Sequence, residues 1–383
     1  MSSPGSTASL RTANLQRVVD VLRAQEAGDP VTQADIARQT GLAPATVSNI
    51  VRELAATGLL EVEPGSGRRG TTVALARSAG LVAGIDFGHS HVAVALGDMT
   101  GSLIAEERHR LNAGHPHTEG LDRAHDLLEQ LLAGAGLERA TIRTIGLGLP
   151  APMTAGVVRS SAILPGWVGV NAPEAAGKRF GAVVHIDNDA NLGALAEHRH
   201  GVARGHDSSV FVKVSSGVGA GIVLEDRLFH GNGGTAGEIG HLTLDENGPV
   251  CRCGSRGCLE AYTSTVALQS MMELQMPGAS VDEIVRAARD GNVSALRALE
   301  DAGLHLGWAL ASVVNLLNPA LVVVGGEMAR AGELLLESAR IGLRRHALDA
   351  VASTPVVASE LGERASLIGA VLLAAERTEL LSD

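Results

Sequence analysis

The chain has 383 residues, a net charge of -11 and a hydrophobic fraction of 45%. This length allows two or three domains with cores of their own, and the acidic balance excludes wholesale nonspecific nucleic-acid binding but not one basic face. No apolar run approaches the roughly 20 residues that span a bilayer and no secretory signal begins the chain, so we expect a cytoplasmic protein with no membrane partner.

The first part of the chain predicts a short tail and three helices. Residues 1–11 are rich in Ser, Gly and Thr, and we expect them to form a disordered tail. A first helix should end at the breaker of residues 28–30, Thr32 can cap a second helix, and Pro44 can begin a third. The first helix is indicated by apolar residues at helical spacing, namely Leu15, Val18, Val19 and Leu22.

The second and third helices are joined by a short turn that contains Gly41, which is the pattern of a helix-turn-helix. Two predicted strands at residues 59–62 and 72–75 then enclose a Gly- and Arg-rich tip at residues 64–70. We therefore expect a winged helix-turn-helix DNA-binding domain over residues 12–76. A three-helix dimerisation or scaffolding module is the alternative.

The third helix would enter the major groove with small or hydrogen-bonding side chains. Seven arginines of residues 10–75 are balanced by seven acidic residues, so the basic groups that bind DNA must lie on one side of the domain. The candidate DNA contacts are Thr46, Ser48, Asn49, Arg52, Arg68 and Arg69.

From Gly80 onward, short apolar strands alternate with Ala- and Leu-rich helices, which predicts an α/β architecture. A helix is expected at residues 121–132 and a closing helix within residues 362–375. The expected strands are 81–85, 91–96, 145–149, 183–186, 210–214, 220–224 and 321–324.

All three cysteines of the chain, Cys251, Cys253 and Cys258, lie within eight residues, and His241 lies ten residues upstream. Four such ligands complete a tetrahedron around one zinc ion and leave no position for water, so we expect a structural zinc site. The alternatives are a disulfide with a spare thiol, or three unrelated cysteines. An odd number of cysteines cannot pair fully within one chain, and Cys251 and Cys253 are too close for an easy unstrained bridge.

Carboxylates lie on both sides of these predicted ligands, at Glu238 and Glu260. Ionised carboxylates accept charge-assisted hydrogen bonds from polyol hydroxyls, worth about 1.5–3 kcal/mol each, so a sugar is the expected guest. The alternative is that both glutamates are solvated surface residues. Upstream, Asp187 and Asp189 end a strand and open a helix, where a carboxylate can either cap the helix or bind a hydroxyl.

The string AGEIGH followed by CRCGSRGCLE resembles the signature of the ROK family, which contains repressors, open reading frames of unknown role and sugar kinases. This resemblance implies a two-lobed, actin-like sugar-kinase fold over residues 77–383, with a small lobe of about 80–185 plus the C-terminal helix and a large lobe of about 186–370. It also implies that the histidine and the cysteines bind zinc. The implied sugar contacts are Asn188, Asp189, Glu238, His241 and Glu260.

The resemblance extends to two loops that bind phosphate in ROK kinases and read D-x-G-G-T-K and G-T-G-x-G-x-G. Here His89 stands at the second glycine of the first loop, no lysine follows, and Ser215 replaces a glycine of the second. Phosphoryl transfer depends on positioning and charge stabilisation. We therefore expect no enzyme and no bound ATP, and Asp189 would occupy a vestigial catalytic-base position.

The expected function is a sugar-responsive transcriptional regulator, a repressor of carbohydrate uptake or metabolism genes. Its partners would be double-stranded operator DNA, a small sugar or sugar phosphate, and further copies of the chain in a homodimer or homotetramer. The alternatives are an active ROK sugar kinase fused to a DNA-binding domain, a regulator that answers to a partner protein, and an activator in place of a repressor.

Overall fold

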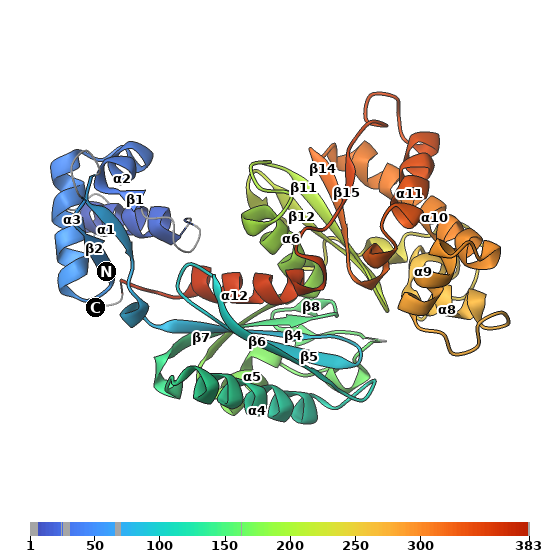
Figure 1. The fold of residues 1–383 in the computed structure, drawn as a ribbon, viewed down its shortest axis with the longest axis horizontal. Helices are drawn as coiled ribbons and strands as arrows, with labels where there is room; N and C mark the ends of the chain where they lie inside the picture. Colours follow the sequence, from blue (N-terminus) through green and yellow to red (C-terminus); the bar gives the residue numbers. More distant parts are fainter. Residues whose placement is uncertain (1–6, 24, 26–30, 66–69, 162, 382–383) are drawn as a thin grey trace.

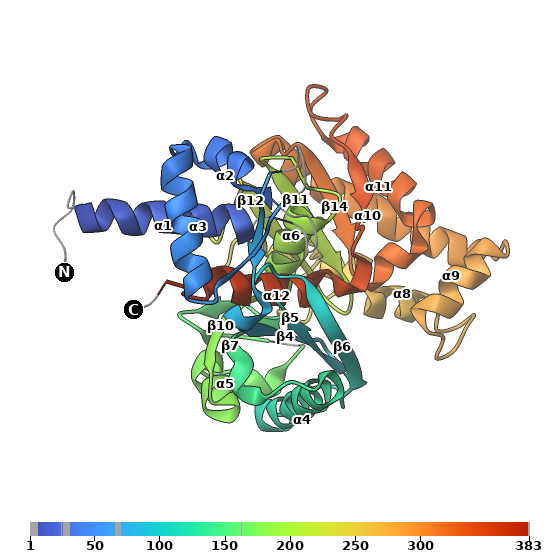
Figure 2. The same cartoon turned by 60° about the vertical axis from the view of Figure 1, so that its left-hand side comes forward.

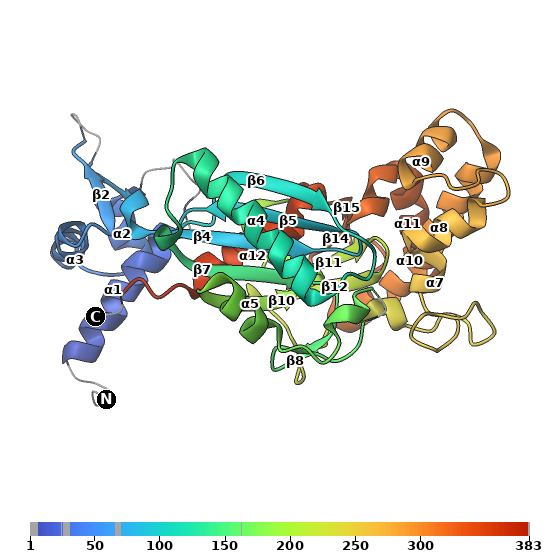
Figure 3. The same cartoon turned by 90° about the horizontal axis from the view of Figure 1, so that it is seen from below.

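The computed structural model describes residues 7–23, 25, 31–65, 70–161 and 163–381, and it contains a small N-terminal domain followed by two α/β lobes (Figure 1). The N-terminal domain lies at one end of the molecule and helices of the large lobe lie at the other (Figure 3). Within the described residues, no helix is both long and apolar enough to cross a membrane.

The N-terminal domain has three helices and a three-stranded antiparallel sheet in the order β1-β3-β2. Local sequence signals determine where the helices of the helix-turn-helix begin and end. Thr32 and Asp35 form a capping box at the start of the second helix. Gly41 ends that helix at φ 68°, a conformation that suits glycine. The elements are α1 (Thr7–Arg23), β1 (Val31–Thr32), α2 (Gln33–Thr40), α3 (Pro44–Ala56), β2 (Leu60–Glu63) and β3 (Thr72–Leu75).

The structure corrects one sequence prediction for this domain, and other predicted features lie outside the described residues. Helix α1 begins at Thr7, so the expectation of a disordered tail reaching residue 11 is wrong for residues 7–11. Residues with good helix propensity continue the helix backward, and Arg11 forms a 2.7 Å ion pair with Glu53 of α3. The predicted wing-tip residues Arg68 and Arg69, and the breaker at residues 28–30, lie outside the described residues.

The two lobes are built on five-stranded sheets with the same topology. In each sheet a three-stranded antiparallel meander is extended by two parallel strands, in the orders β10-β7-β4-β5-β6 and β13-β12-β11-β14-β15. The strands expected from the sequence are present, and β6, β13 and β15 join them as edge strands that were not predicted. The expected α/β fold class is thus confirmed.

The small-lobe elements are β4 (Leu81–Phe87), β5 (His91–Gly97), β6 (Leu103–Arg110), α4 (His117–Ala135), β7 (Ile142–Leu149), β8 (Met153–Thr154), β9 (Val157–Val158), α5 (Ala172–Phe180) and β10 (Val183–Asn188). The large-lobe elements are α6 (Asp189–His200), β11 (Ser209–Val214), β12 (Val218–Leu224), β13 (Arg227–Leu228), α7 (Glu260–Thr263), α8 (Thr265–Met272), α9 (Val281–Arg289), α10 (Val293–Leu317), β14 (Leu321–Gly325), α11 (Glu333–His346) and β15 (Val356–Ala358). Short 3-10 helices are η1 (Arg77–Ala79), η2 (Arg139–Thr141), η3 (Pro165–Trp167), η4 (Ile239–His241), η5 (Glu327–Ala331) and η6 (Gly362–Arg364).

The last helix, α12 (Ala365–Arg377), lies between the lobes (Figures 1 and 2). One side of α12 covers the small-lobe sheet over β4 and β7, and another packs on α6, which covers β11 and β12 of the large lobe. These contacts are unusually close. A Cβ on Gly369 would lie 1.9 Å from the Leu192 carbonyl oxygen of α6, and a Cβ on Gly146 of β7 would lie 1.9 Å from the Ala370 carbonyl oxygen.

Replacing Gly369 by alanine should therefore destabilise the protein, because the new methyl group would collide with main chain rather than with a flexible side chain. Overpacking of this kind costs about 1–3 kcal/mol, and urea unfolding of the full chain measures it. Gly134→Ala is the matched control, since a Cβ there meets nothing within 4 Å among the described residues. The control should be neutral or slightly stabilising, and an equal loss in both variants would contradict the packing argument.

Candidate functional site

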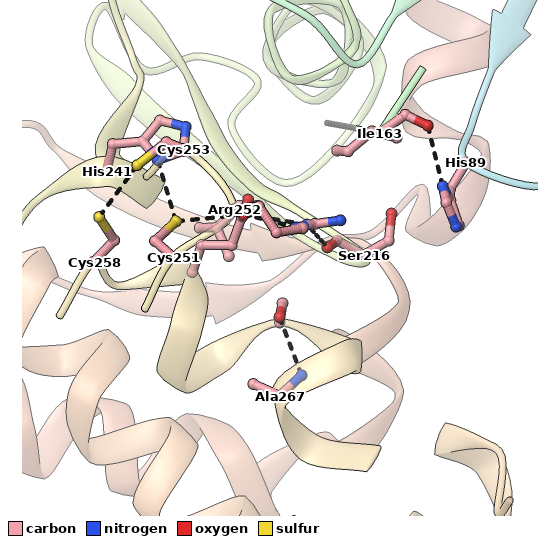
Figure 4. A network of polar contacts seen from close by, with 12 residues as sticks. His89, Ile163, Ser216, His241, Cys251, Arg252, Cys253, Cys258 and Ala267 are labelled. Atoms are coloured by element: carbon pink, nitrogen blue, oxygen red, sulfur yellow. Dashed lines mark hydrogen bonds and ion pairs between the residues drawn. The ribbon is translucent and has the colours of Figure 1, made fainter. Parts of the chain in front are cut away.

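The four predicted metal ligands come together in a compact loop at the edge of the large lobe (Figure 4). Their ligand atoms all lie within 4.8 Å of one another, and the three cysteines are unpaired. The loop is shaped by main-chain contacts, in which Val250 pairs with Arg256 and the Cys251 amide donates to the Ser255 carbonyl oxygen at 2.8 Å. His241 lies outside the cysteine loop, as the last residue of the short 3-10 helix η4.

The distances within this cluster fit a tetrahedral ion. Zinc–sulfur bonds of about 2.3 Å that meet at tetrahedral angles place two sulfurs about 3.8 Å apart. Cys253 Sγ and Cys258 Sγ are 3.7 Å apart, and Cys251 Sγ is 3.8 Å from His241 Nδ1. The residues present therefore fit a closed site with three thiolates and one imidazole, and the cluster is compatible with a structural metal.

The thiols of this cluster differ in acidity. Burial raises the pKa of Cys258 to about 12 and also raises the pKa of Cys251, whereas a main-chain hydrogen bond with Ser255 lowers the pKa of Cys253. The ligands of a zinc ion must be deprotonated, so an ion that enters here displaces protons from the two buried thiols.

Glu260 lies against the cysteine cluster and is already held by protein groups. Its carboxylate accepts hydrogen bonds from the Val218 main-chain amide at 3.1 Å and from the Arg252 guanidinium at 3.3 and 3.1 Å. Arg252, which the sequence analysis did not single out, stands between two of the cysteines and also donates to the Ser216 carbonyl oxygen (Figure 4). Arg252 lies in sequence between two predicted zinc ligands, and this position could have indicated that it contributes to the site.

Asn188 and Asp189 lie at the junction of β10 and α6, as the sequence predicted. The side chain of Asn188 caps α6 by accepting a hydrogen bond from the Ala190 amide at 2.8 Å, so the cap is Asn188 rather than either neighbouring aspartate. Asp187 instead contacts His230 Nε2 at 2.7 Å, and this pairing raises the pKa of His230.

Asp189 is buried and forms a 2.7 Å ion pair with Lys213 of β11, a lysine within an otherwise apolar strand. Burial alone would lower the pKa of Lys213, but the carboxylates of Asp189 and Asp86 raise it above its ordinary value. Lys213 thus stays charged and compensates buried carboxylates of both lobes. Its role was not predicted from the sequence, although a charged residue in a buried strand is itself a signal.

Glu238 is half-buried and is affected by the charges of other site residues. Its pKa is raised, first by burial and further by the charges of Asp189 and Glu260, against an opposing effect of His241. The charges of carboxylates from separate elements of the large lobe therefore act on one another, and Glu260 among them lies 3.9 Å from Cys251 Sγ. A surface hollow of about 610 Å³ lies elsewhere, between α4 and α5, and the predicted ligand-binding residues do not line it.

Side chains of the two loops that resemble phosphate-binding loops form polar contacts with other residues of the protein. His89 Nδ1 is 3.2 Å from the Ile163 carbonyl oxygen (Figure 4). Ser215 Oγ accepts a hydrogen bond from the Glu327 amide at 3.0 Å. Asp86 is buried, and its Oδ2 is 3.7 Å from His91 Nε2.

The candidate DNA contacts that the structure describes all lie on α3. Asn49 and Arg52 are exposed, Thr46 and Ser48 are half-buried, and Arg52 donates a 3.2 Å hydrogen bond to the Asn49 side chain. The opposite face of α3 fills the core of the domain through four apolar residues, Val47, Ile50, Val51 and Leu54.

Comparison with known proteins gives matches over nearly the whole chain. The model of the ROK family matches residues 82–377, and that of the MarR family matches residues 14–70. The xylose repressor of Bacillus subtilis (strain 168) is 28% identical over 350 residues, which cover 89% of this chain and 90% of the repressor. The DNA-binding transcriptional dual regulator NagC of Escherichia coli (strain K12) is 30% identical over 405 residues, covering 97% of this chain and 96% of NagC.

Among solved structures, a ROK family transcriptional regulator described as a homolog of the E. coli MLC protein superposes with a TM-score of 0.79 at 25% identity. The superposition covers 95% of this chain and 96% of the regulator. These matches confirm the ROK resemblance stated for the AGEIGH and CRCGSRGCLE strings and the winged helix-turn-helix predicted for the N-terminal domain.

The metal site can be tested by removing one ligand. We expect the purified wild-type chain to carry about one zinc ion per chain and Cys258→Ser to carry less than about half, because three ligands hold zinc more weakly than a closed set of four. Elemental analysis measures the content. The matched control is Ser255→Ala, since Ser255 is exposed in the same loop and contributes its carbonyl group. Wild-type protein that lacks zinc after handling without chelators would contradict the assignment.

Proposed function

The chain belongs to the ROK family, and from this premise we propose that it is a sugar-responsive, DNA-binding transcriptional regulator that represses genes of carbohydrate uptake or metabolism. The observation that carries the proposal is that the charges of two buried carboxylates, Asp189 and Glu260, both act on Glu238, in a chain that also has a winged helix-turn-helix. The names of its relatives, a xylose repressor and NagC, support the same class of function.

The proposed effector is a small sugar or a sugar phosphate. Carboxylates accept hydrogen bonds from hydroxyl groups, and these charge-assisted bonds contribute about 1.5–3 kcal/mol each. Burial raises the pKa of Glu238, and the charges of Asp189 and Glu260 raise it further, so a guest that donates several hydroxyls would compensate for the lost hydration of these buried carboxylates. The proposed sugar-binding residues are Asn188, Asp189, Glu238, His241 and Glu260.

The proposed zinc ion has a structural role. His241, Cys251, Cys253 and Cys258 would hold it and leave no open coordination position. Because Nδ1 is the ring atom of His241 that faces Cys251, Nε2 remains free to donate a hydrogen bond to a sugar hydroxyl. The ion would also fix the main chain that carries Glu238 and Glu260, which lie three residues before the first ligand and two residues after the last.

The proposed DNA contacts are Thr46, Ser48, Asn49 and Arg52 of α3, together with Arg68 and Arg69 from the predicted wing tip. Helix-turn-helix proteins read paired half-sites as dimers, so we expect a homodimer or homotetramer on operator DNA. Sugar binding would change the relative placement of the two winged domains and lower the affinity for DNA. By linkage, DNA must then lower the affinity for sugar by the same factor.

We propose further that the protein is not an enzyme and does not depend on ATP. A catalytic base must be free to accept a proton from the attacking hydroxyl. The 2.7 Å ion pair between Asp189 and Lys213 supports a binding role instead, since it occupies one carboxylate oxygen. His89, in place of a loop glycine, puts an imidazole where ROK kinases have none.

An active ROK sugar kinase fused to a DNA-binding domain is the second candidate, and the retained Asp189 favours it. A coupled assay of ADP release with pentoses, hexoses, aminosugars and their phosphates separates the two. We expect no turnover above background with any of these sugars. Sustained ADP release with one of these sugars would show that the protein is a sugar kinase and would contradict the proposal that it only senses the sugar.

A variant at Glu238 tests the sugar response. A gel shift on the DNA upstream of its own gene, repeated with the same sugar panel, should reveal a sugar that releases the wild-type protein. Glu238→Ala should retain DNA binding and lose the response to that sugar, because one acceptor of its hydroxyls is gone. Glu246→Ala is the matched control, since Glu246 is exposed on the same segment. An unchanged response in Glu238→Ala would refute the sugar site.

A variant at Arg52 tests the DNA-reading face. Loss of one base or phosphate contact costs about 1–3 kcal/mol, so Arg52→Ala should bind the same DNA about 5- to 150-fold more weakly. Fluorescence anisotropy at fixed salt measures the affinity. Arg344→Ala removes an exposed charge of the large lobe, far from the N-terminal domain, and should bind as wild type does. Equal losses in both variants would assign the effect to net charge.

A further inference from the structure

Helix α12 begins beside the proposed sugar site. Ser366, in its first turn, is buried and donates a 2.8 Å hydrogen bond to the main-chain oxygen of Asp189. Lys213 donates a 2.9 Å hydrogen bond to the Ser366 hydroxyl while it pairs with the Asp189 carboxylate at 2.7 Å. Any ligand that moves the Asp189 carboxylate must therefore disturb Lys213, and with it the first turn of α12.

The other end of α12 meets the DNA-binding domain. Arg23, the last residue of α1, donates hydrogen bonds from its guanidinium group to the main-chain oxygens of Glu376, at 3.4 Å, and of Thr378. The last carbonyl groups of a helix have no partner within the helix and carry partial negative charge, so a cation there is favourable. Arg23 therefore acts as a cap that the DNA-binding domain supplies to a helix of the sugar-binding domain.

The apolar contacts join the same two parts. Core residues of the N-terminal domain, such as Val18 and Leu22, belong to one continuous cluster with Val371, Ala374 and Ala375 of α12. Arg23 is the polar contact at the margin of this cluster, and burial lowers its pKa. The DNA-binding domain thus shares an apolar cluster with α12 and is hydrogen-bonded to its C-terminal end through Arg23, instead of being joined to it through a linker alone.

The helix is able to transmit a displacement from one end to the other. Its 13 residues span roughly 20 Å at 1.5 Å per residue. Close main-chain contacts hold two adjacent residues of α12, Gly369 against Leu192 of α6 and Ala370 against Gly146 of β7, so no side chain there can absorb a shift. A displacement of its first turn must therefore be shared by α6, by the small-lobe sheet, or by the DNA-binding domain at its far end.

We propose that α12 carries the effector signal to the DNA-binding domain, with Ser366 and Lys213 as positioning residues at the sugar end and Arg23 as the positioning residue at the DNA end. This inference rests on the proposed function. Arg23 holds the winged domain in one orientation on α12, and movement of the first turn changes that orientation. The spacing of two DNA-reading helices in a dimer then changes with it.

The test measures the coupling factor, which is the ratio of the DNA dissociation constants with and without the sugar that releases the wild-type chain. Allosteric coupling typically amounts to about 5- to 150-fold, and Arg23→Gln in the full-length protein should reduce it to below about 3-fold. The variant should bind sugar in the absence of DNA within about 2-fold of wild type, since Arg23 lies at the far end of α12 from the sugar site. A merely structural role would instead lower both affinities together. Arg17→Gln, on an exposed position of the same helix α1, is the matched control and should keep the wild-type factor.

Two further variants keep the test decisive. If Arg23→Gln does not fold, Arg23→Lys retains the cation without the planar fork and should show an intermediate factor. At the other end, Ser366→Ala should lower the factor, whereas Ser338→Ala, a buried serine of α11 outside this network, should not. Full coupling in the Arg23 and Ser366 variants would overturn the role of α12 and leave the proposed function standing. A wild-type chain that binds sugar and DNA without coupling would overturn both.

Discussion

Close main-chain contacts that only glycine permits hold α12 between the two lobes of this molecule. Gly369 brings α12 against the main chain of α6, and Gly146 brings β7 against the main chain of α12, so the two lobes share one central pair of helices. Buried charged groups also stabilise the contact between the lobes. Lys213 neutralises Asp189 and interacts with Asp86 across the boundary between the two lobes. The lobes therefore cannot shift independently of α12, and a signal between them has few other routes.

Much of the fold follows from local sequence signals. Thr32 and Pro44 begin their helices as predicted, and most strands of both sheets lie within a few residues of the expected ranges, because alternating apolar runs and cap residues are local properties. The start of α1 at Thr7 was missed because composition alone suggested a tail. Strand β6 was missed because its exposed, charged side chains give no apolar pattern.

The candidate site was only partly predictable. The cysteine cluster and the flanking glutamates stand together in sequence, so their proximity needs no knowledge of the fold. The partners Lys213, Arg252 and His230 become visible only when strands and loops distant in sequence are brought together. The comparisons with known proteins show the family to which the chain belongs. The residue assignments for zinc, sugar and DNA depend on the geometry of the site and on the experiments that follow from it.

The contact between Arg23 and the end of α12 is made to main-chain oxygens and not to side chains. Its two sides are therefore under unequal evolutionary constraint. Positions 376 and 378 can drift in sequence without loss of the acceptors, provided that the helix still ends there, whereas the arginine has no substitute with the same forked donor geometry. Exchange of winged domains between relatives would then succeed most readily where the donor domain brings an arginine at the end of its own first helix.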